Sequence, residues 1–337
     1  MTAKTIDVLG IGNAIVDVLA YHEEAFLTEQ GLAKGGMTLV DEAEGTALYH
    51  AMGATTECSG GSAANTLAGI AMLGGKAAFI GKVKDDQLGE IFSRDLNQCG
   101  VSFNTPMALS GPSTARCCIV VTEEESPFGN PPKVERTMAT FLGASVTVGK
   151  DDINPELIKQ SKVLYLEGYL WDSPSAKEAI HESITIAKEH NTKVAFSLSD
   201  GFCVERHHEE FLQLIKNDVD ILFANEHEIE ALVGESDIGK ILYHMNGICD
   251  VVAVTRSEKG SYILHDGEIH SVDPIKVESV FDVTGAGDLY AAGFLYGFTN
   301  DMGLDKAGKL GSLCAAEVIK YLGARPVTKL QSLLQSA

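Results

Sequence analysis

The segment Asp282-Val283-Thr284-Gly285-Ala286-Gly287-Asp288 gives the strongest indication of fold and function in this 337-residue chain. It follows a strand-like stretch and precedes an apolar, helix-forming run, Leu289–Phe298. Three small residues in succession, 285–287, let backbone N–H groups point into one concavity, and the start of the helix adds partial positive charge there. The segment therefore predicts an anion hole at a helix N-terminus.

Asp288 lies just inside the start of this helix and is a candidate general base. A carboxylate at this position can take the proton from a hydroxyl that attacks a phosphorus held in the hole. The alternative is a plain helix start, with Thr284 as the cap and Asp288 stabilising the helix dipole. The segment alone leaves both interpretations open.

Further motifs give the chain a resemblance to the ribokinase-like carbohydrate kinases, also called the phosphofructokinase B family, which includes adenosine kinase. Residues 282–288 match the family signature D-T-x-G-A-G-D, with Val283 in place of Thr. Cys58-Ser59-Gly60-Gly61-Ser62-Ala63-Ala64-Asn65 is similar to the N-terminal glycine-rich signature, and Gly12-Asn13-Ala14-Ile15-Val16-Asp17 resembles the substrate-binding turn. Asn225-Glu226-His227-Glu228 fits the N-x-x-E element. The motifs follow the family order over nearly the whole chain.

The alternation of apolar β-branched runs with amphipathic stretches predicts an α/β fold, a parallel sheet covered by helices on both faces. The expected strands are Ile6–Gly10, Ala77–Ile80, Val163–Leu166, Val194–Ser197, Ile221–Phe223 and Val251–Val254. The expected helices lie near Ser62–Leu73, Gln87–Cys99, Ser175–His190, Glu209–Lys216, Glu226–Val233, Ala286–Phe298 and Leu304–Tyr321. The resemblance implies a ribokinase-like three-layer α/β/α arrangement with a mostly parallel central sheet and a small β-sheet lid.

Two regions, residues 13–44 and 101–141, interrupt this alternation with turn residues and short alternating runs. Ala115–Thr122 and Glu135–Phe141 are typical of small antiparallel strands. The two regions could meet as one lid beside the main sheet, or they could be unrelated surface excursions. We expect the lid to be built from 13–44 and 101–141, and the catalytic core from 1–12, 45–100 and 142–337.

The polar residues of the first two motifs suit a sugar. Asp17 can accept hydrogen bonds from vicinal hydroxyls, Asn13 and Asn65 can both donate and accept, and Gly60 lets the backbone approach a ring closely. The resemblance implies a substrate site formed by Asn13, Asp17, Gly60, Gly61, Ser62 and Asn65. The alternative treats Asp17 as a turn residue and Gly60-Gly61 as a lead into a helix.

The resemblance also implies ATP and Mg²⁺ as cofactors, and it leaves a monovalent cation such as K⁺ open. Asn225 and Glu228 would orient magnesium through its waters, because Mg²⁺ gives up water reluctantly. Otherwise Glu228 is a solvated helix charge. Arg136, on a lid strand, is the candidate cation for the transferring phosphate, since a planar guanidinium suits spread phosphoryl charge. The alternative is an exposed lid arginine.

Nucleotide contacts are expected from Asn225, Thr255, Ser257, Gly260 and Cys314. The family often has T-x-G before its adenine-side turn, whereas this chain has Thr255-Arg256-Ser257 before Gly260. Cys314 lies on the last helix, where relatives pack the adenine, although an apolar helix face is more often plain core.

The charge balance restricts the partners. The chain has 26 Lys and Arg against 47 Asp and Glu, a net charge of −21, which disfavours nucleic acid and anionic membranes.

We find no secretion signal at the N-terminus, and the uncharged stretch Cys58–Gly75 is too rich in Gly, Ser and Asn to span a membrane. Seven cysteines without a C-x-x-C pair favour reduced thiols. We expect a cytoplasmic protein, monomer or homodimer, with a small-molecule sugar or nucleoside as partner.

Two other nucleotide motifs fail. Ile15 stands where a dinucleotide fingerprint after Gly10-Ile11-Gly12 needs its third glycine, and Lys76 stands where a P-loop ending at Gly81-Lys82 needs its first. The family resemblance implies an ATP-dependent kinase that phosphorylates a primary hydroxyl of a nucleoside or sugar. Arg136-Thr137-Met138 followed by Leu142-Gly143-Ala144 resembles adenosine kinases more than ribokinase, which favours an adenosine-like nucleoside. Ribose or another sugar is the alternative substrate, and a nucleoside- or sugar-binding regulatory protein on a kinase fold is the alternative without catalysis.

Overall fold

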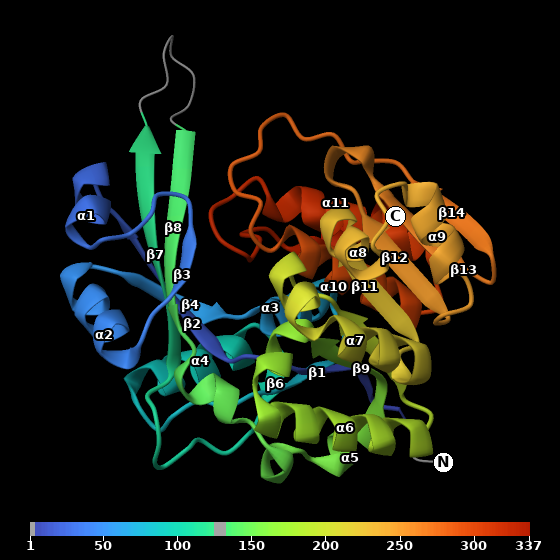
Figure 1. The fold of residues 1–337 in the computed structure, drawn as a ribbon, viewed down its shortest axis with the longest axis horizontal. Coiled ribbons are helices and arrows are strands. Elements are labelled where there is room, and N and C mark those ends of the chain that lie inside the picture. The colour runs from blue at the N-terminus through green and yellow to red at the C-terminus, as the bar shows by residue number, and fades with distance from the viewer. Residues whose placement is uncertain (1–3, 125–132) are drawn as a thin grey trace.

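Two β-sheets and their flanking helices make up the computed structural model, which describes residues 4–124 and 133–337 (Figure 1). The larger sheet has nine strands in the order β14-β13-β12-β11-β10-β9-β1-β5-β6. Its strands are β1 Ile6–Ile11, β5 Ala77–Ile80, β6 Val101–Phe103, β9 Ser161–Glu167, β10 Lys193–Ser197, β11 Ile221–Asn225, β12 Val251–Thr255, β13 Ser261–His265 and β14 Glu268–Val272. All neighbours from β6 to β12 are parallel, and β13 and β14 add an antiparallel edge.

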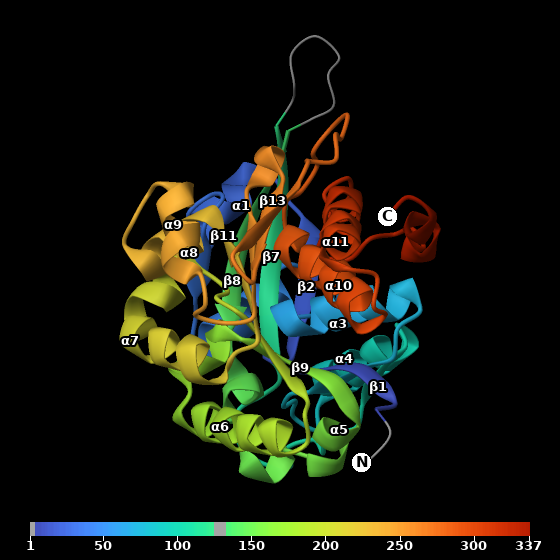
Figure 2. The same ribbon diagram turned by 90° about the vertical axis from the view of Figure 1, so that its right-hand side faces the viewer.

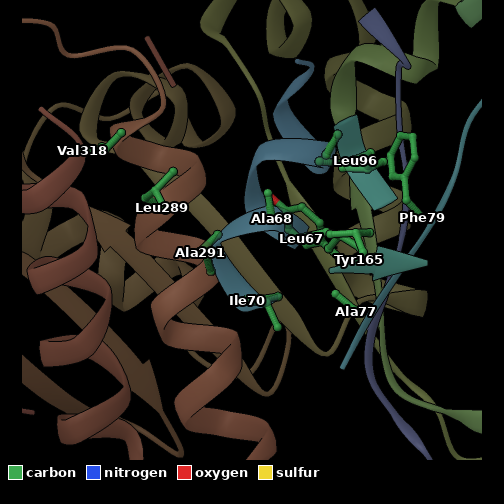
Figure 3. Packing of buried hydrophobic residues seen from close by; sticks show 14 of the residues in the cluster. Leu67, Ala68, Ile70, Ala77, Phe79, Leu96, Tyr165, Leu289, Ala291 and Val318 are labelled. Atoms are coloured by element: carbon green, nitrogen blue, oxygen red, sulfur yellow. The ribbon is translucent and has the colours of Figure 1, made fainter. Parts of the chain in front are cut away.

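Helices cover both faces of this sheet because its strands are apolar on both sides. Val8 and Tyr165 belong to one hydrophobic core, and their neighbours Leu9 and Leu166 to the other. The first core is closed by α3 Ser62–Leu73, α4 Gln87–Gln98, α10 Ala286–Thr299 and α11 Leu304–Val318 (Figure 3). The second is closed by α5 Pro155–Gln160, α6 Pro174–Glu189, α7 Gly201–Asp218, α8 Glu226–Val233 and α9 Ile238–Met245 (Figure 2). The predicted three-layer α/β/α fold is confirmed.

Short 3₁₀ helices complete the core at η2 Gly143–Thr147, η3 Lys150–Asp152, η4 Gly168–Asp172, η5 Ser257–Lys259 and η6 Leu330–Gln335. In the described part of the chain, every helix is too short or too polar to cross a membrane.

The smaller sheet stands at one end of the core and has the order β3-β8-β7-β2-β4 (Figure 1). Its strands are β2 Ile15–Tyr21, β3 Met37–Leu39, β4 Thr56–Gly60, β7 Ala115–Glu124 and β8 Lys133–Phe141. The helices α1 Glu24–Glu29 and α2 Glu42–Ala51 cover one face of it. The predicted antiparallel pair is confirmed, since β7 pairs antiparallel with β8.

The predicted division between core and lid was wrong at β4 and β6, and its boundary at residue 45 falls inside α2, which covers the smaller sheet. Strand β4 belongs to the smaller sheet, although 45–100 was assigned to the core, because it pairs with β2 and places Cys58 opposite Asp17. Its sequence lacks the apolar β-branched run that indicates a strand. Strand β6 belongs to the larger sheet, although 101–141 was assigned to the lid, because it follows α4 directly and pairs parallel with β5.

Candidate active site

A cleft of about 590 Å³ lies between the smaller sheet and the carboxyl ends of the core strands. Most of the predicted site residues line it: Asn13, Asp17, Gly61, Ser62, Asn65, Arg136, Asn225, Glu228, Thr255, Gly285, Ala286, Gly287 and Asp288. Gly60 lies directly behind this lining, because a Cβ there would stand 2.5 Å from the Asp17 carboxylate. The structure thus brings motifs from both ends of the chain to one place.

Asp288 lies in the first turn of α10, at the floor of the cleft. Ser62 donates from Oγ to its Oδ1 over 2.7 Å, and Asn65 donates from Nδ2 to its Oδ2 over 3.1 Å. Burial raises the pKa of Asp288, while these two hydrogen bonds and the charge of Arg325 oppose the rise. The carboxylate is held in one orientation by two donors, as a general base requires.

The backbone of the predicted anion hole requires glycine at position 285. Gly285 has a φ of 74°, and a Cβ on it would lie 2.7 Å from the Cα of Ala324. At Gly287 a Cβ would meet no heavy atom within 4 Å, so the backbone there faces open space. The first N–H groups of α10 have no partners within the helix and can bind a phosphate.

Glu167 is a site residue that the sequence analysis missed. It ends β9, has no exposed surface, and accepts hydrogen bonds from Asn13 N and Nδ2, both at 2.7 Å, and from Ala63 N at 2.9 Å. Burial raises its pKa to about 7. Glu167 therefore orients Asn13 and the start of α3, and its position at the carboxyl end of a buried strand was the signal that could have identified it.

Asp17 projects from the cleft face of β2, opposite Cys58 of β4 and Cys117 of β7. Burial raises its pKa to about 6, and the charges of Arg325 and Arg136 oppose this rise. Arg325 was also missed, because it lies in a loop after α11 that carries no motif.

Arg136 reaches across from β8 to the anion-hole segment. Its Nη1 donates to Asp282 Oδ2 over 2.6 Å and also to Thr284 Oγ1. Its Nε is buried without a hydrogen-bond partner among the described residues. Asp282 also accepts from Gly323 N at 2.8 Å, so the arginine is anchored beside the hole. The predicted lid cation thus lies beside the segment that carries the predicted anion hole.

Asn225 and Glu228 form a capping box at the start of α8. Asn225 N and Nδ2 donate to the Glu228 carboxylate over 2.9 and 2.6 Å. Burial, with Asp200 and Asp288 nearby, raises the pKa of Glu228 to about 7. Carboxylate oxygens are ligands that suit Mg²⁺. The described residues hold no cluster of three or more metal-ligating side chains.

Of the other residues predicted to contact the nucleotide, only some line the cleft. Thr255 ends β12 and lines the cleft, whereas Ser257 and Gly260 lie outside its lining. Gly260 has a φ of 85°, and a Cβ on it would lie 2.1 Å from Val272 O. The backbone of the β12–β13 connection therefore requires glycine at this position. Cys314 has no exposed surface and packs in the hydrophobic core. The prediction that it contacts nucleotide is therefore not supported, and the alternative, plain core, holds.

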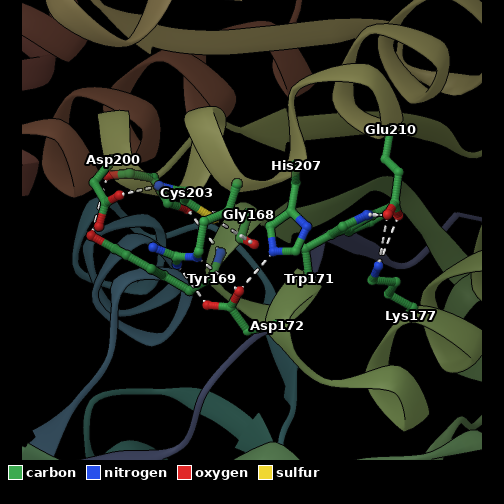
Figure 4. A network of polar contacts seen from close by, with 11 residues as sticks. Gly168, Tyr169, Trp171, Asp172, Lys177, Asp200, Cys203, His207 and Glu210 are labelled. Carbon is green, nitrogen blue, oxygen red and sulfur yellow. Dashed lines mark hydrogen bonds and ion pairs between the residues drawn. The ribbon is translucent and has the colours of Figure 1, made fainter. Parts of the chain in front are cut away.

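A further wall of the cleft is formed by η4 and the start of α7. Figure 4 shows polar contacts between these two elements. Tyr169 and Phe202 line it, with Tyr169 donating from its hydroxyl to Ser199 O over 3.2 Å. Asp172 accepts from Arg206 Nη2 over 2.7 Å and contacts the His207 ring at 2.6 Å. The sequence analysis placed no site residue on this wall.

The fold and the cleft define a small-molecule kinase, and comparison with known proteins assigns the family. Residues 37–330 match the pfkB family carbohydrate kinases. The chain belongs to this family of phosphotransferases, which act on an alcohol group of sugars or nucleosides.

Among solved structures, adenosine kinase from Sinorhizobium meliloti is 47% identical, with a TM-score of 0.88 over 99% of this chain and 100% of that chain. A probable sugar kinase from Rhizobium etli is 43% identical, with a TM-score of 0.89 over 99% of both chains. A 5-dehydro-2-deoxygluconokinase from Lacticaseibacillus casei is 30% identical over 79% of this chain and 81% of its own length.

Proposed function

We propose that this protein transfers the γ-phosphoryl group of ATP to a primary hydroxyl of an adenosine-like nucleoside. The observation that carries the proposal is the mixed lining of the cleft. Polar side chains are supplied by Asn13, Asp17, Asn65 and Asp288, and apolar or aromatic ones by Ile15, Met37, Leu39, Cys117, Ile119, Met138, Tyr169 and Phe202. A ribose suits the polar groups, and a flat, largely apolar base suits the apolar and aromatic ones. The 47% identity to an adenosine kinase supports this choice.

The substrate hydroxyl would lie at Asp288. As the hydroxyl oxygen forms its bond to the γ-phosphorus, the bond from that phosphorus to the ADP oxygen breaks and Asp288 takes the proton. The N–H groups of Gly285–Gly287 and the Arg136 guanidinium stabilise charge on the transferring group. Closure of the lid would exclude water, whose attack on ATP is the competing reaction.

Asn225 and Glu228 would hold Mg²⁺ through water at the ATP side of the cleft. The ion supplies charge neutralisation between phosphate oxygens, which a chain of net charge −21 needs in order to bind a polyanion. Potassium activation, a cytoplasmic location and a monomeric or homodimeric state belong to the same proposal.

A sugar is the second candidate, because the curated relatives at 27–30% identity are 5-dehydro-2-deoxygluconokinases. A sugar acid would need a cation for its carboxylate. Of the two arginines that line the cleft, Arg136 is assigned to the transferring phosphate and Arg206 is paired with Asp172. The nucleoside therefore fits better.

A coupled ADP-release assay over adenosine, other nucleosides, ribose, fructose and 5-dehydro-2-deoxygluconate tests the proposal, with and without KCl. We expect the highest kcat/KM with adenosine, and Tyr169→Ala should raise the KM for adenosine more than that for ribose. A preference for a free sugar or sugar acid would overturn the substrate assignment, and binding without turnover of any compound would favour the regulatory alternative.

A further inference from the structure

Arg325 connects the lid to the core just behind the substrate end of the cleft. Its Nη1 donates to Ser59 Oγ over 2.7 Å and to Asp95 Oδ2 over 3.3 Å, and its Nε donates to Asn65 Oδ1 over 3.3 Å. Ser59 lies on the lid strand β4, Asp95 on α4 and Asn65 on α3. One guanidinium therefore ties three elements together.

The contact with Asn65 determines what that side chain presents to Asp288. An amide has an oxygen that accepts and a nitrogen that donates. Because Arg325 occupies the oxygen, the nitrogen points to Asp288, where Nδ2 lies 3.1 Å from Oδ2. The opposite orientation would set the amide oxygen against the carboxylate and the amide nitrogen against the guanidinium, which is unfavourable on both sides.

We propose that Arg325 is a positioning residue for phosphoryl transfer, which holds Asn65 so that the Asp288 carboxylate stays aimed at the substrate hydroxyl and couples this arrangement to lid strand β4. The proposal rests on the proposed general-base role of Asp288. Arg325 would act through Asn65 rather than by touching the substrate, since it does not line the cleft.

The charges around Asp288 support this role. Asp288 raises the pKa values of the neighbouring carboxyls of Asp17, Glu167 and Glu228, so negative charge is crowded in this part of the cleft. Burial raises the pKa of Asp288 itself, and the charge of Arg325 acts against this rise. Its Nη2 is buried without a hydrogen-bond partner among the described residues, a cost that a neutral residue of similar length would avoid.

The test compares two variants. Arg325→Met removes both the planar guanidinium group and its charge, whereas Arg325→Lys keeps the charge but not the guanidinium group. The matched control is Arg94→Met, which removes the same charge from an exposed position on α4. The readout is kcat against pH between pH 5.5 and 9.5, with whichever acceptor the wild type phosphorylates, so that a wrong substrate class does not affect the result. Normal turnover by Asp288→Asn would separately overturn the base role.

We expect Arg325→Met to lower kcat at pH 7 by about tenfold or more and to move the acidic limb of the profile up by about one pH unit, because an opposite charge nearby lowers a carboxyl pKa by 1–3 units. Arg325→Lys should leave the limb in place but lower kcat several-fold, and Arg94→Met should match the wild type. An unmoved limb in Arg325→Met would reduce Arg325 to a structural role and overturn the proposal. If that variant does not fold, Arg325→Lys decides, and a wild-type kcat in it would contradict positioning by the guanidinium fork.

Discussion

Ser62 donates a hydrogen bond from Oγ to Oδ1 of Asp288 over 2.7 Å, across 226 positions of sequence. Ser62 is the first residue of α3, directly after Gly60 and Gly61, and Asp288 lies in the first turn of α10. The two glycine-rich segments therefore meet at one carboxylate. Because both helices begin there, their positive ends face the place where the hydroxyl and the phosphate would react.

Gly287→Val tests the anion hole. A Cβ at this position would meet no protein atom within 4 Å, so the fold should survive, while the added side chain would occupy the space of the phosphate. We expect kcat to fall by about 10²-fold or more, as when an oxyanion donor is lost. Gly201→Val, at the start of α7 and also without neighbours within 4 Å, is the control and should keep its activity. Circular dichroism checks folding, and a folded Gly287→Val enzyme of wild-type rate would refute the hole.

The pKa of Asp17 predicts a pH effect on substrate binding. Burial raises that pKa to about 6, and the ionised carboxylate accepts hydrogen bonds from two vicinal hydroxyls more strongly than the protonated acid does. The KM for the nucleoside should therefore rise as the pH falls below about 6. Asp17→Asn should show a high KM that does not change with pH. A wild-type nucleoside KM that is flat between pH 5 and 7 would exclude this contact.

The same shift has a consequence for stability. The folded pKa of about 6 lies above the ordinary value of 3.8, so the free energy of unfolding is reduced as the pH rises through this range. Asp17→Asn should raise the thermal midpoint at pH 7–8 and give no gain below about pH 4. A gain that is equal at both pH values would show that ionisation is not its cause.

Deoxy analogues test which hydroxyls Asp17 contacts. Asp17→Ala should raise the nucleoside KM by about tenfold or more, because a hydrogen bond to a charged acceptor contributes about 1.5–3 kcal/mol. A 2′-deoxy or 3′-deoxy analogue should suffer a similar loss with the wild type, and the two changes together should cost little more than either alone. Fully additive penalties would mean that Asp17 touches neither hydroxyl.

Glu228→Gln tests the magnesium side. The variant keeps an oxygen for the capping box but removes the charge that orients the hydrated ion. The Mg²⁺ concentration for half-maximal activity should rise roughly tenfold or more, the effect typical of lost outer-shell partners. Glu226→Gln, on the same helix but paired with Arg256 and Lys259 outside the cleft, should leave it unchanged. Equal magnesium dependence in both variants would remove Glu228 from the metal site.

Local patterns predicted the elements that carry strong signals. Helix α3 was predicted with its observed bounds, because an apolar small-residue run begins after Gly61 and ends at Gly74, whose φ of 98° terminates the helix. The hairpin β13–β14 was missed, although Asp266 and Gly267, both with positive φ, form the Asp-Gly turn that marks such hairpins. That signal was in the sequence and was not used.

Other features depend on contacts that no local pattern encodes. Strand β4 is defined by its pairing with β2 rather than by its own residues, and Arg325 reaches the site only because the loop after α11 passes behind Asn65. The motif residues could be predicted because backbone geometry restricts them to small or acidic types. The residues that orient them could not, because a buried acid or a loop arginine has many possible partners.

The most direct test of the central claim is a single-turnover measurement of phosphoryl transfer by Asp288→Asn, with Mg–ATP and the preferred acceptor. The asparagine can keep the hydrogen bond from Ser62 but cannot take the hydroxyl proton. We predict that transfer slows by at least about 10²-fold, the lower end of general acid–base contributions, while the Kd for ATP stays within about twofold of the wild type. Transfer at the wild-type rate by a folded Asp288→Asn protein would contradict the account.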